Sequence, residues 1–113
     1  MKLPEVSKEE LKRHSKKYIT YSQRIIDALG DGLYMSVIDG GLVAYNYWGN
    51  GKDNNIDIEI FYNEYSKGYQ VVVWGISDRG KDEGFASNMA ELEELYHQMK
   101  EKYYTEQKDV DTQ

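Results

Sequence analysis

The sequence of 113 residues contains no cysteine and a single proline. Without cysteine there is no disulfide, no thiol nucleophile and no cysteine-ligated zinc, which agrees with a reducing compartment. No apolar run approaches the ~20 residues of a membrane-spanning helix. The N-terminal stretch MKLPEVSKEELKRHSKK has no apolar core of the kind found in secretory signals. We therefore expect a cytoplasmic protein.

Positive charge is scarce outside the N-terminal quarter. Residues 1–29 hold seven Lys/Arg and four Asp/Glu, a balance of +3, whereas residues 30–113 hold seven and sixteen, a balance of −9. An acidic body repels phosphate backbones and attracts basic partners. The charge pattern argues against direct nucleic-acid binding, with the basic N-terminal helix as a minor exception, and it favours a basic protein partner.

Phenylalanine is also scarce, with two residues against eleven tyrosines. Tyrosine combines a large ring with a polar tip and is enriched at protein interfaces. Two interpretations stay open at this point. The tyrosines either form a recognition surface or fill half-buried positions of helices and strands.

Two helices are predicted near the ends of the chain. Ser7 and Glu10 form a capping-box pattern, and Gly30 suits a helix C-terminus, so we expect a helix over residues 7–29. Ser87 or Asn88 can cap a second helix, and with Asn88 as the cap Glu91 falls three residues later. The apolar stripe of the first helix contains Leu11, Tyr18, Ile25 and Leu29, and that of the second contains Met89, Leu92, Tyr96, Met99 and Tyr103.

Four strand-like runs lie between the helices, at residues 33–38, 42–48, 56–65 and 69–76. Asp39-Gly40-Gly41 and Ser66-Lys67-Gly68 predict hairpin turns, and residues 77–84 are interpreted as a polar loop. The order α-β-β-β-β-α favours an α+β domain spanning residues 1–113, with frayed tails at 1–6 and 105–113. We expect a four-stranded antiparallel sheet with the N- and C-terminal helices packed on one face.

The parity of the strands determines what the other sheet face displays. If the isoleucines of residues 56–60 face the helices, then Asp57, Glu59 and Phe61 lie on the uncovered face. The neighbouring strands then add Tyr45, Tyr47 and Trp74. The pattern does not fix strand order, oligomeric state or which face the helices cover.

The stretch DNNIDIEIFYNE, residues 53–64, also has an acidic spacing that resembles a calcium loop. A helix–loop–helix calcium site needs glycine at its sixth position, where this chain has Ile58. The two-residue period with three isoleucines favours a strand instead. A weaker cation site near Asp53, Asn55 and Asp57 stays open, and we predict no metal and no cofactor.

Catalytic patterns are absent from the sequence. His14 and His97 fall on different predicted helices without a convergent third ligand. No serine stands in a nucleophile motif. We therefore expect a protein that is not an enzyme, with a small-ligand carrier as a minor alternative.

In size, acidity and order of elements the chain is similar to bacterial immunity proteins, which inhibit toxin nucleases. This resemblance implies a protein-binding module that neutralises a basic partner. Phage-type inhibitors that mimic nucleic-acid charge and a homo-oligomeric subunit, possible as a homodimer, are the alternatives. The candidate partner-binding residues are Tyr45, Tyr47, Trp48, Asp57, Glu59 and Trp74, together with Asp78, Asp82 and Glu83 of the predicted loop.

Overall fold

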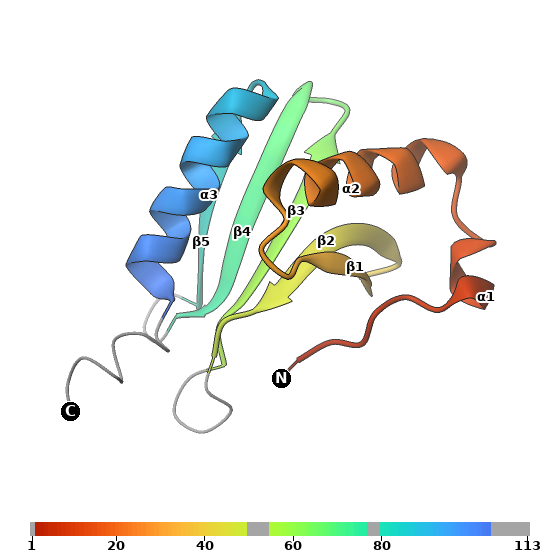
Figure 1. The fold of residues 1–113 in the computed structure, drawn as a ribbon, viewed down its shortest axis with the longest axis horizontal. Coiled ribbons are helices and arrows are strands. Elements are labelled where there is room, and N and C mark those ends of the chain that lie inside the picture. Colours follow the sequence, from red (N-terminus) through yellow and green to blue (C-terminus); the bar gives the residue numbers. More distant parts are fainter. Residues whose placement is uncertain (1, 50–54, 77–79, 105–113) are drawn as a thin grey trace.

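The computed structural model describes residues 2–49, 55–76 and 80–104. In chain order the elements are α1 (Lys8–Leu11), α2 (Lys16–Leu29), β1 (Tyr34–Ile38), β2 (Gly41–Tyr47), β3 (Asp57–Asn63), β4 (Gly68–Ile76), β5 (Gly80–Ala86) and α3 (Met89–Tyr103). The strands form one antiparallel sheet in the order β1-β2-β3-β4-β5. Helices α2 and α3 lie on the same side of this sheet (Figure 1). The predicted α+β class and the antiparallel sheet are confirmed.

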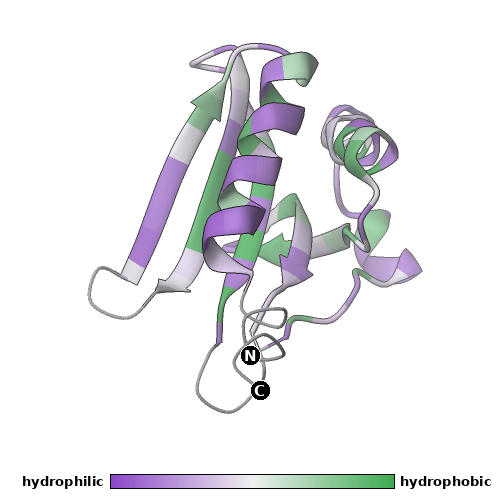
Figure 2. Cartoon of the chain, turned by 60° about the vertical axis from the view of Figure 1, so that its left-hand side comes forward, coloured by the Kyte–Doolittle hydropathy of each residue, from purple (hydrophilic) through white to green (hydrophobic). Residues whose placement is uncertain are grey.

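The core lies between the sheet and the two long helices. Alternate residues of β3 and β4 point toward the helices, and Ile58, Ile60, Val71 and Val73 are fully buried there. From the helices, α2 contributes Ile25 and α3 contributes the predicted stripe, of which Leu92, Tyr96, Met99 and Tyr103 are buried. Figure 2 shows hydrophobic residues along the inner strands and a mixed pattern along α3.

Of the two predicted caps, Ser87 and Asn88, it is Asn88 that begins α3. The side chain of Asn88 accepts a hydrogen bond from the backbone N–H of Glu91 at 2.9 Å, and the Glu91 carboxylate accepts one from the N–H of Ser87 at 2.9 Å. Two backbone donors that the helix itself leaves unpaired are thereby satisfied. None of the helices among the described residues has the length and apolar character needed to cross a membrane.

The N-terminal helix is interrupted, contrary to the prediction of one helix over residues 7–29. Ser7 caps α1 as expected, accepting from the N–H of Glu10 at 3.1 Å, but α1 ends at Leu11. Ser15 then has an extended backbone and begins α2. The intervening residues 12–14 place no large apolar side chain on the helical stripe. Since helices in proteins are held mainly by packing of an apolar face, nothing keeps a continuous helix there.

The fifth strand, β5, replaces part of the polar loop predicted for residues 77–84. Its sequence GKDEGFA contains a single large apolar residue, so strand periodicity was not visible. Small residues suit this edge because α3 packs directly on it. A Cβ atom placed on Gly84 would lie 2.8 Å from Cδ1 of Leu95. The loop prediction was therefore wrong for residues 80–84.

The predicted β1–β2 hairpin is present, with both turn residues in the left-handed region. Asp39 has φ 52° and Gly40 has φ 81°, which is the geometry of a type I′ turn. Strand β2 pairs with β1 from Gly41 to Tyr45, but its register with β3 runs from Ala44 to Tyr47. The tip of the hairpin thus diverges from β3, as the course of β1 and β2 in Figure 1 shows.

Residues 3–6, called here the N-terminal segment, lie against β1 and β2 instead of fraying as predicted. The N–H of Leu3 donates to the hydroxyl of Tyr45 at 3.0 Å, and the hydroxyl of Tyr34 donates to the carbonyl of Leu3 at 2.6 Å. Ser36 Oγ donates to the Pro4 carbonyl at 2.7 Å. These bonds satisfy polar groups of the edge strand β1 and protect that edge of the sheet. The predicted frayed tail at 105–113 lies outside the described residues.

Candidate functional site

The side of the sheet opposite α2 and α3, called here the open face, carries the predicted mixture of acidic and aromatic residues. The strand register places three cross-strand rows on it. The first is Tyr34, Tyr45, Glu59, Val72 and Glu83; the second is Tyr47, Asp57, Trp74 and Lys81; the third contains Phe61, Gln70 and Phe85. The predicted parity of β3, with its isoleucines toward the helices, is confirmed.

Two large aromatic side chains of the open face are exposed. Trp74 is 39% exposed and Phe85 is 47% exposed, whereas Val72 between their rows is buried. The ammonium of Lys81 lies 5.1 Å from the Trp74 ring centre, within the range of a cation–π contact. The N-terminal segment covers the β1–β2 part of the face, so the accessible part lies on β3, β4 and β5.

Glu59 occupies the centre of this face and is almost completely buried, with 6% of its surface exposed. Its Oε2 atom has no hydrogen-bond partner among the described residues. Burial raises the pKa of the Glu59 carboxyl; a hydrogen bond with the Trp74 side chain opposes this shift, the negative charge of Asp39 adds to it, and the positive charge of Lys81 opposes it. Buried carboxylate oxygens are normally hydrogen-bonded, and Oε2 of Glu59 departs from this rule among the described residues.

Asp57 is the second carboxylate of β3 on this face and is half-buried. Burial raises its pKa, and a hydrogen bond from the Tyr45 hydroxyl opposes the shift. Its Oδ1 atom is buried and has no hydrogen-bond partner in the part of the chain that the structure describes. Glu83, by contrast, has a side chain that is 49% exposed and lies 3.7 Å from the ammonium of Lys81. The three carboxylates therefore range from buried to exposed.

The other predicted partner-binding residues do not share one accessible surface. Trp48 belongs to the helix-side core, with its ring 5.7 Å from that of Tyr96. Tyr45 points to the open face but is fully buried beneath the N-terminal segment, and burial raises its pKa. Neither ring offers an accessible surface to a partner. Tyr47 is partly exposed, and its hydroxyl donates to Oδ1 of Asn55 at 2.8 Å.

The predicted convergence of Asp78, Asp82 and Glu83 is not formed by the described residues. Because residues 80–86 form a strand, Asp82 and Glu83 point to opposite faces of the sheet. Asp82 faces α3, where it accepts a hydrogen bond from the Tyr103 hydroxyl at 2.5 Å. Asp78 lies outside the described residues, as does Asp53 of the weak cation site considered above.

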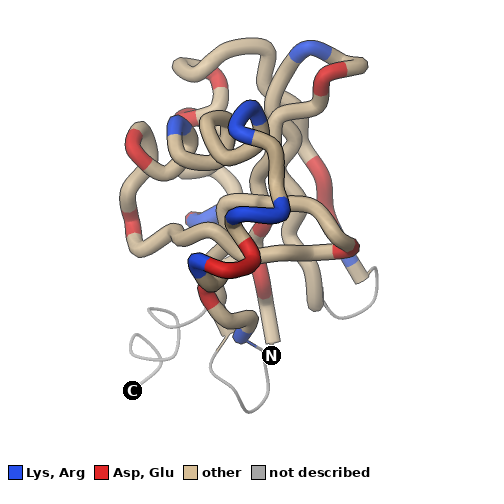
Figure 3. Tube along the Cα trace, turned by 90° about the vertical axis from the view of Figure 1, so that its right-hand side faces the viewer, with Lys and Arg blue, Asp and Glu red and all other residues tan. Residues whose placement is uncertain are grey.

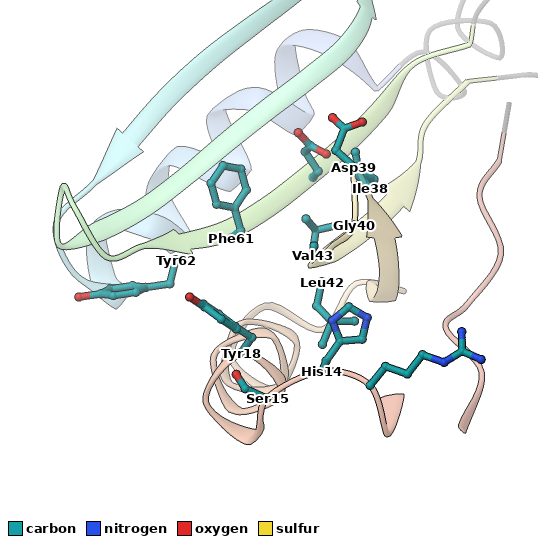
Figure 4. A pocket seen from close by; sticks show the side chains of 13 residues that line it. His14, Ser15, Tyr18, Ile38, Asp39, Gly40, Leu42, Val43, Phe61 and Tyr62 are labelled. Atoms are coloured by element: carbon teal, nitrogen blue, oxygen red, sulfur yellow. The ribbon is translucent and has the colours of Figure 1, made fainter. Parts of the chain in front are cut away.

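A cleft of about 570 Å³ opens where β2 diverges from β3 (Figure 4). It is bordered by the β1–β2 hairpin tip, by β3 and by the start of α2. The lining residues come from both faces of the sheet and are Arg13, His14, Ser15, Tyr18, residues 38–43, Glu59, Phe61 and Tyr62. Glu59 thus lies at the edge between the open face and this cleft.

Sequence reasoning missed three contributors to the site. Asp39 was recognised as a turn residue, but only the bend of the hairpin brings it near Glu59. Phe85 and Lys81 were hidden in the stretch interpreted as a loop. Their alternation with Glu83 in GKDEGFA is the one signal that indicates a shared face.

The described residues hold no group of three or more His, Asp or Glu side chains placed to bind a metal ion. The calcium-loop stretch forms strand β3 from Asp57 onward. His14 is engaged by the Glu10 carboxylate at 2.8 Å, and the lysine and arginine residues of the N-terminal quarter gather along the α1–α2 part of the chain (Figure 3). The basic helical segment approaches the open face at the cleft, which Arg13 and His14 line together with Glu59.

No family model matches the chain, and no curated protein or solved structure shows significant similarity to it.

Proposed function

We propose that this protein is a small acidic binding module that docks a basic protein on its open face, as a toxin-neutralising immunity protein does. One observation carries the proposal: the buried carboxylate of Glu59 has an unpaired oxygen on a face that also exposes Trp74 and Phe85. The net charge of −6 agrees with a basic partner.

A carboxylate removed from water without a counter-charge destabilises the free protein. A cationic group of a partner offsets that cost when it docks, so the same residue favours the complex. Exposed tryptophan and phenylalanine supply the apolar contacts on which interface affinity concentrates. The acidic field around them accelerates encounter with a basic protein.

The same observation disfavours pairing of two copies through this face. A symmetric dimer places each residue near the same surface of its partner. Glu59 and Glu83 of one copy would then face the acidic row of the other, with Lys81 as the cation among them. Like charges in such an arrangement weaken association. A basic partner therefore fits the open face better than a second copy does.

The test compares two charge reversals of equal size on opposite sides of the molecule. Glu83→Lys alters the open face, and Glu94→Lys alters an exposed position of α3. Immobilised protein is incubated with lysate of the source organism at low salt, and bound proteins are eluted by raising the salt. We expect the wild type and Glu94→Lys to bind a basic protein that Glu83→Lys does not bind. Equal capture by all three, or release by Glu94→Lys alone, would contradict the proposal.

A further inference from the structure

The cleft beside Glu59 combines a strand gap with an unsatisfied charge. Residues 41–43 of β2 pair with β1, and residues 61–63 of β3 pair with β4, but the register between these two stretches is open. We propose that the cleft binds one arginine side chain of the basic partner, with Glu59 and Asp39 receiving its guanidinium. This inference rests on the proposed function and specifies the group that the partner inserts.

The charge balance inside the cleft calls for a cation. Its two basic groups already have an acidic partner, because Arg13 lies 3.2 Å and His14 lies 2.8 Å from the carboxylate of Glu10. Among the described residues neither of its two acidic groups forms an ion pair, although the Trp74 side chain is hydrogen-bonded to Glu59 and Lys81 adds a positive field there. Oε2 of Glu59 is buried and has no hydrogen-bond partner in the described part of the chain, and Asp39 is an exposed carboxylate whose field acts on it. An incoming cation therefore meets two carboxylates that no described residue holds in an ion pair.

The shape and lining of the cleft favour arginine over other cations. A volume of about 570 Å³ accommodates a long side chain. Phe61, Val43 and Ile38 provide apolar wall for its methylene groups (Figure 4). A planar guanidinium donates to two carboxylates at once and stacks on aromatic rings, whereas an ammonium is a compact, strongly hydrated charge. A divalent metal lacks a third acidic or histidine ligand among the described residues.

The direct probe is N-acetyl-arginine N-methylamide, added to the ¹⁵N-labelled protein at low salt and followed by amide chemical shifts. We expect saturable shifts centred on Val43 and Phe61, with a dissociation constant on the order of 1 mM. The matching lysine derivative is expected to bind at least about threefold more weakly. The uncharged citrulline derivative has the same shape without the charge and is expected to produce no saturable shift.

Two isosteric variants locate the binding group. Glu59→Gln is expected to lower the affinity for the arginine probe at least about tenfold, since one charged partner is lost. Glu94→Gln, at an exposed position of α3 on the other side of the sheet, is expected to change it by less than about twofold because a distant surface charge is screened by solvent. An unchanged ¹H–¹⁵N spectrum outside the cleft shows that each variant is folded.

The outcomes separate this inference from the proposed function. Failure of the arginine probe, equal binding of the citrulline derivative, or shifts produced by Ca²⁺ or Mg²⁺ instead would overturn the arginine cleft. The open-face proposal would still stand if Glu83→Lys released a basic protein in the capture experiment. The converse outcome is that the arginine probe binds in a Glu59-dependent way while Glu83→Lys captures the same proteins as the wild type. That result would support the arginine cleft and refute protein docking on the open face.

Discussion

Replacing Glu59 by glutamine should stabilise the free protein, although it weakens partner binding. The substitution keeps the shape of the side chain and removes a charge that is 94% buried, since Glu59 is 6% exposed. Its Oε2 atom makes no hydrogen bond with the described residues, so none is lost there. Functional sites commonly carry such destabilising groups, and their removal raises stability at the expense of activity.

The amide of glutamine stays unpaired at the same position, so the gain is the part of the burial cost that belongs to the charge, about 1–3 kcal/mol. For a domain of this size that corresponds to a rise in melting temperature of about 4–12 °C. Urea unfolding monitored by circular dichroism at pH 7 gives the free energy directly. Glu83→Gln is the matched control, because Glu83 lies in the same row with a half-exposed side chain, and we expect it to change stability by less than about 0.5 kcal/mol.

The advantage of Glu59→Gln should depend on pH with a defined sign. Burial raises the folded-state pKa of Glu59 above its ordinary value of 4.5, so the folded protein binds a proton more tightly than the unfolded chain. Wild-type stability therefore falls as pH rises from 4.5 through the folded-state pKa. The gap between variant and wild type should be full above that pKa and vanish below 4.5. A destabilised variant at pH 7, or a gap independent of pH, would refute the reasoning.

Three further substitutions test the architecture that positions the open face. Asp31→Ala should cost about 1–3 kcal/mol in urea unfolding, since Asp31 accepts the hydroxyl of buried Tyr96 at 2.6 Å; no loss would show that this link between the α2–β1 turn and α3 is dispensable. Gly84→Val should cost about 1–3 kcal/mol by overpacking against Leu95, and Leu95→Ala should restore part of it; the absence of rescue would contradict this contact. Tyr45→Phe removes the hydroxyl that accepts from Leu3 and donates to Asp57, and should cost about 1–3 kcal/mol, with faster amide hydrogen exchange in the N-terminal segment; unchanged exchange would mean that the segment is held by other contacts.

Much of the fold was predictable because local and global signals agree. The alternation of β3 and the valine run of β4 indicate strands, and the glycines at positions 40 and 41 indicate the hairpin. The Asn88 cap and the apolar stripe define α3. In each case one short stretch contains both the periodicity and its termination signal, so tertiary contacts are not needed to recognise it.

The wrong predictions concern segments whose structure depends on tertiary contacts. Strand β5 has almost no apolar residues and exists because it pairs with β4 and lies beneath α3. The helix is interrupted between α1 and α2 because residues 12–14 have no large apolar side chain to pack against the core. The N-terminal segment is ordered by bonds to residues about thirty or forty positions away, such as Tyr34 and Tyr45. No local pattern encodes such partners.

The side of the sheet on which each candidate site residue lies was predictable, but the burial of these residues was not. Parity alone placed Asp57, Glu59 and Trp74 on one side of the sheet. Burial of Tyr45 and Glu59, and the cleft beside Asp39, depend on how the β1–β2 hairpin bends away from β3. That bend changes an expected surface of exposed acids into one buried carboxylate at the border of a cleft.

The central claim is that a basic protein docks on the open face through the unpaired carboxylate of Glu59. The most direct measurement is parallel capture from lysate of the source organism by the wild type, Glu59→Gln and Glu94→Gln, quantified by mass spectrometry of the salt eluate. The two variants change net charge equally, but they lie on opposite sides of the molecule. We expect the wild type and Glu94→Gln to retain a basic protein that Glu59→Gln does not retain. Equal retention on all three would contradict it.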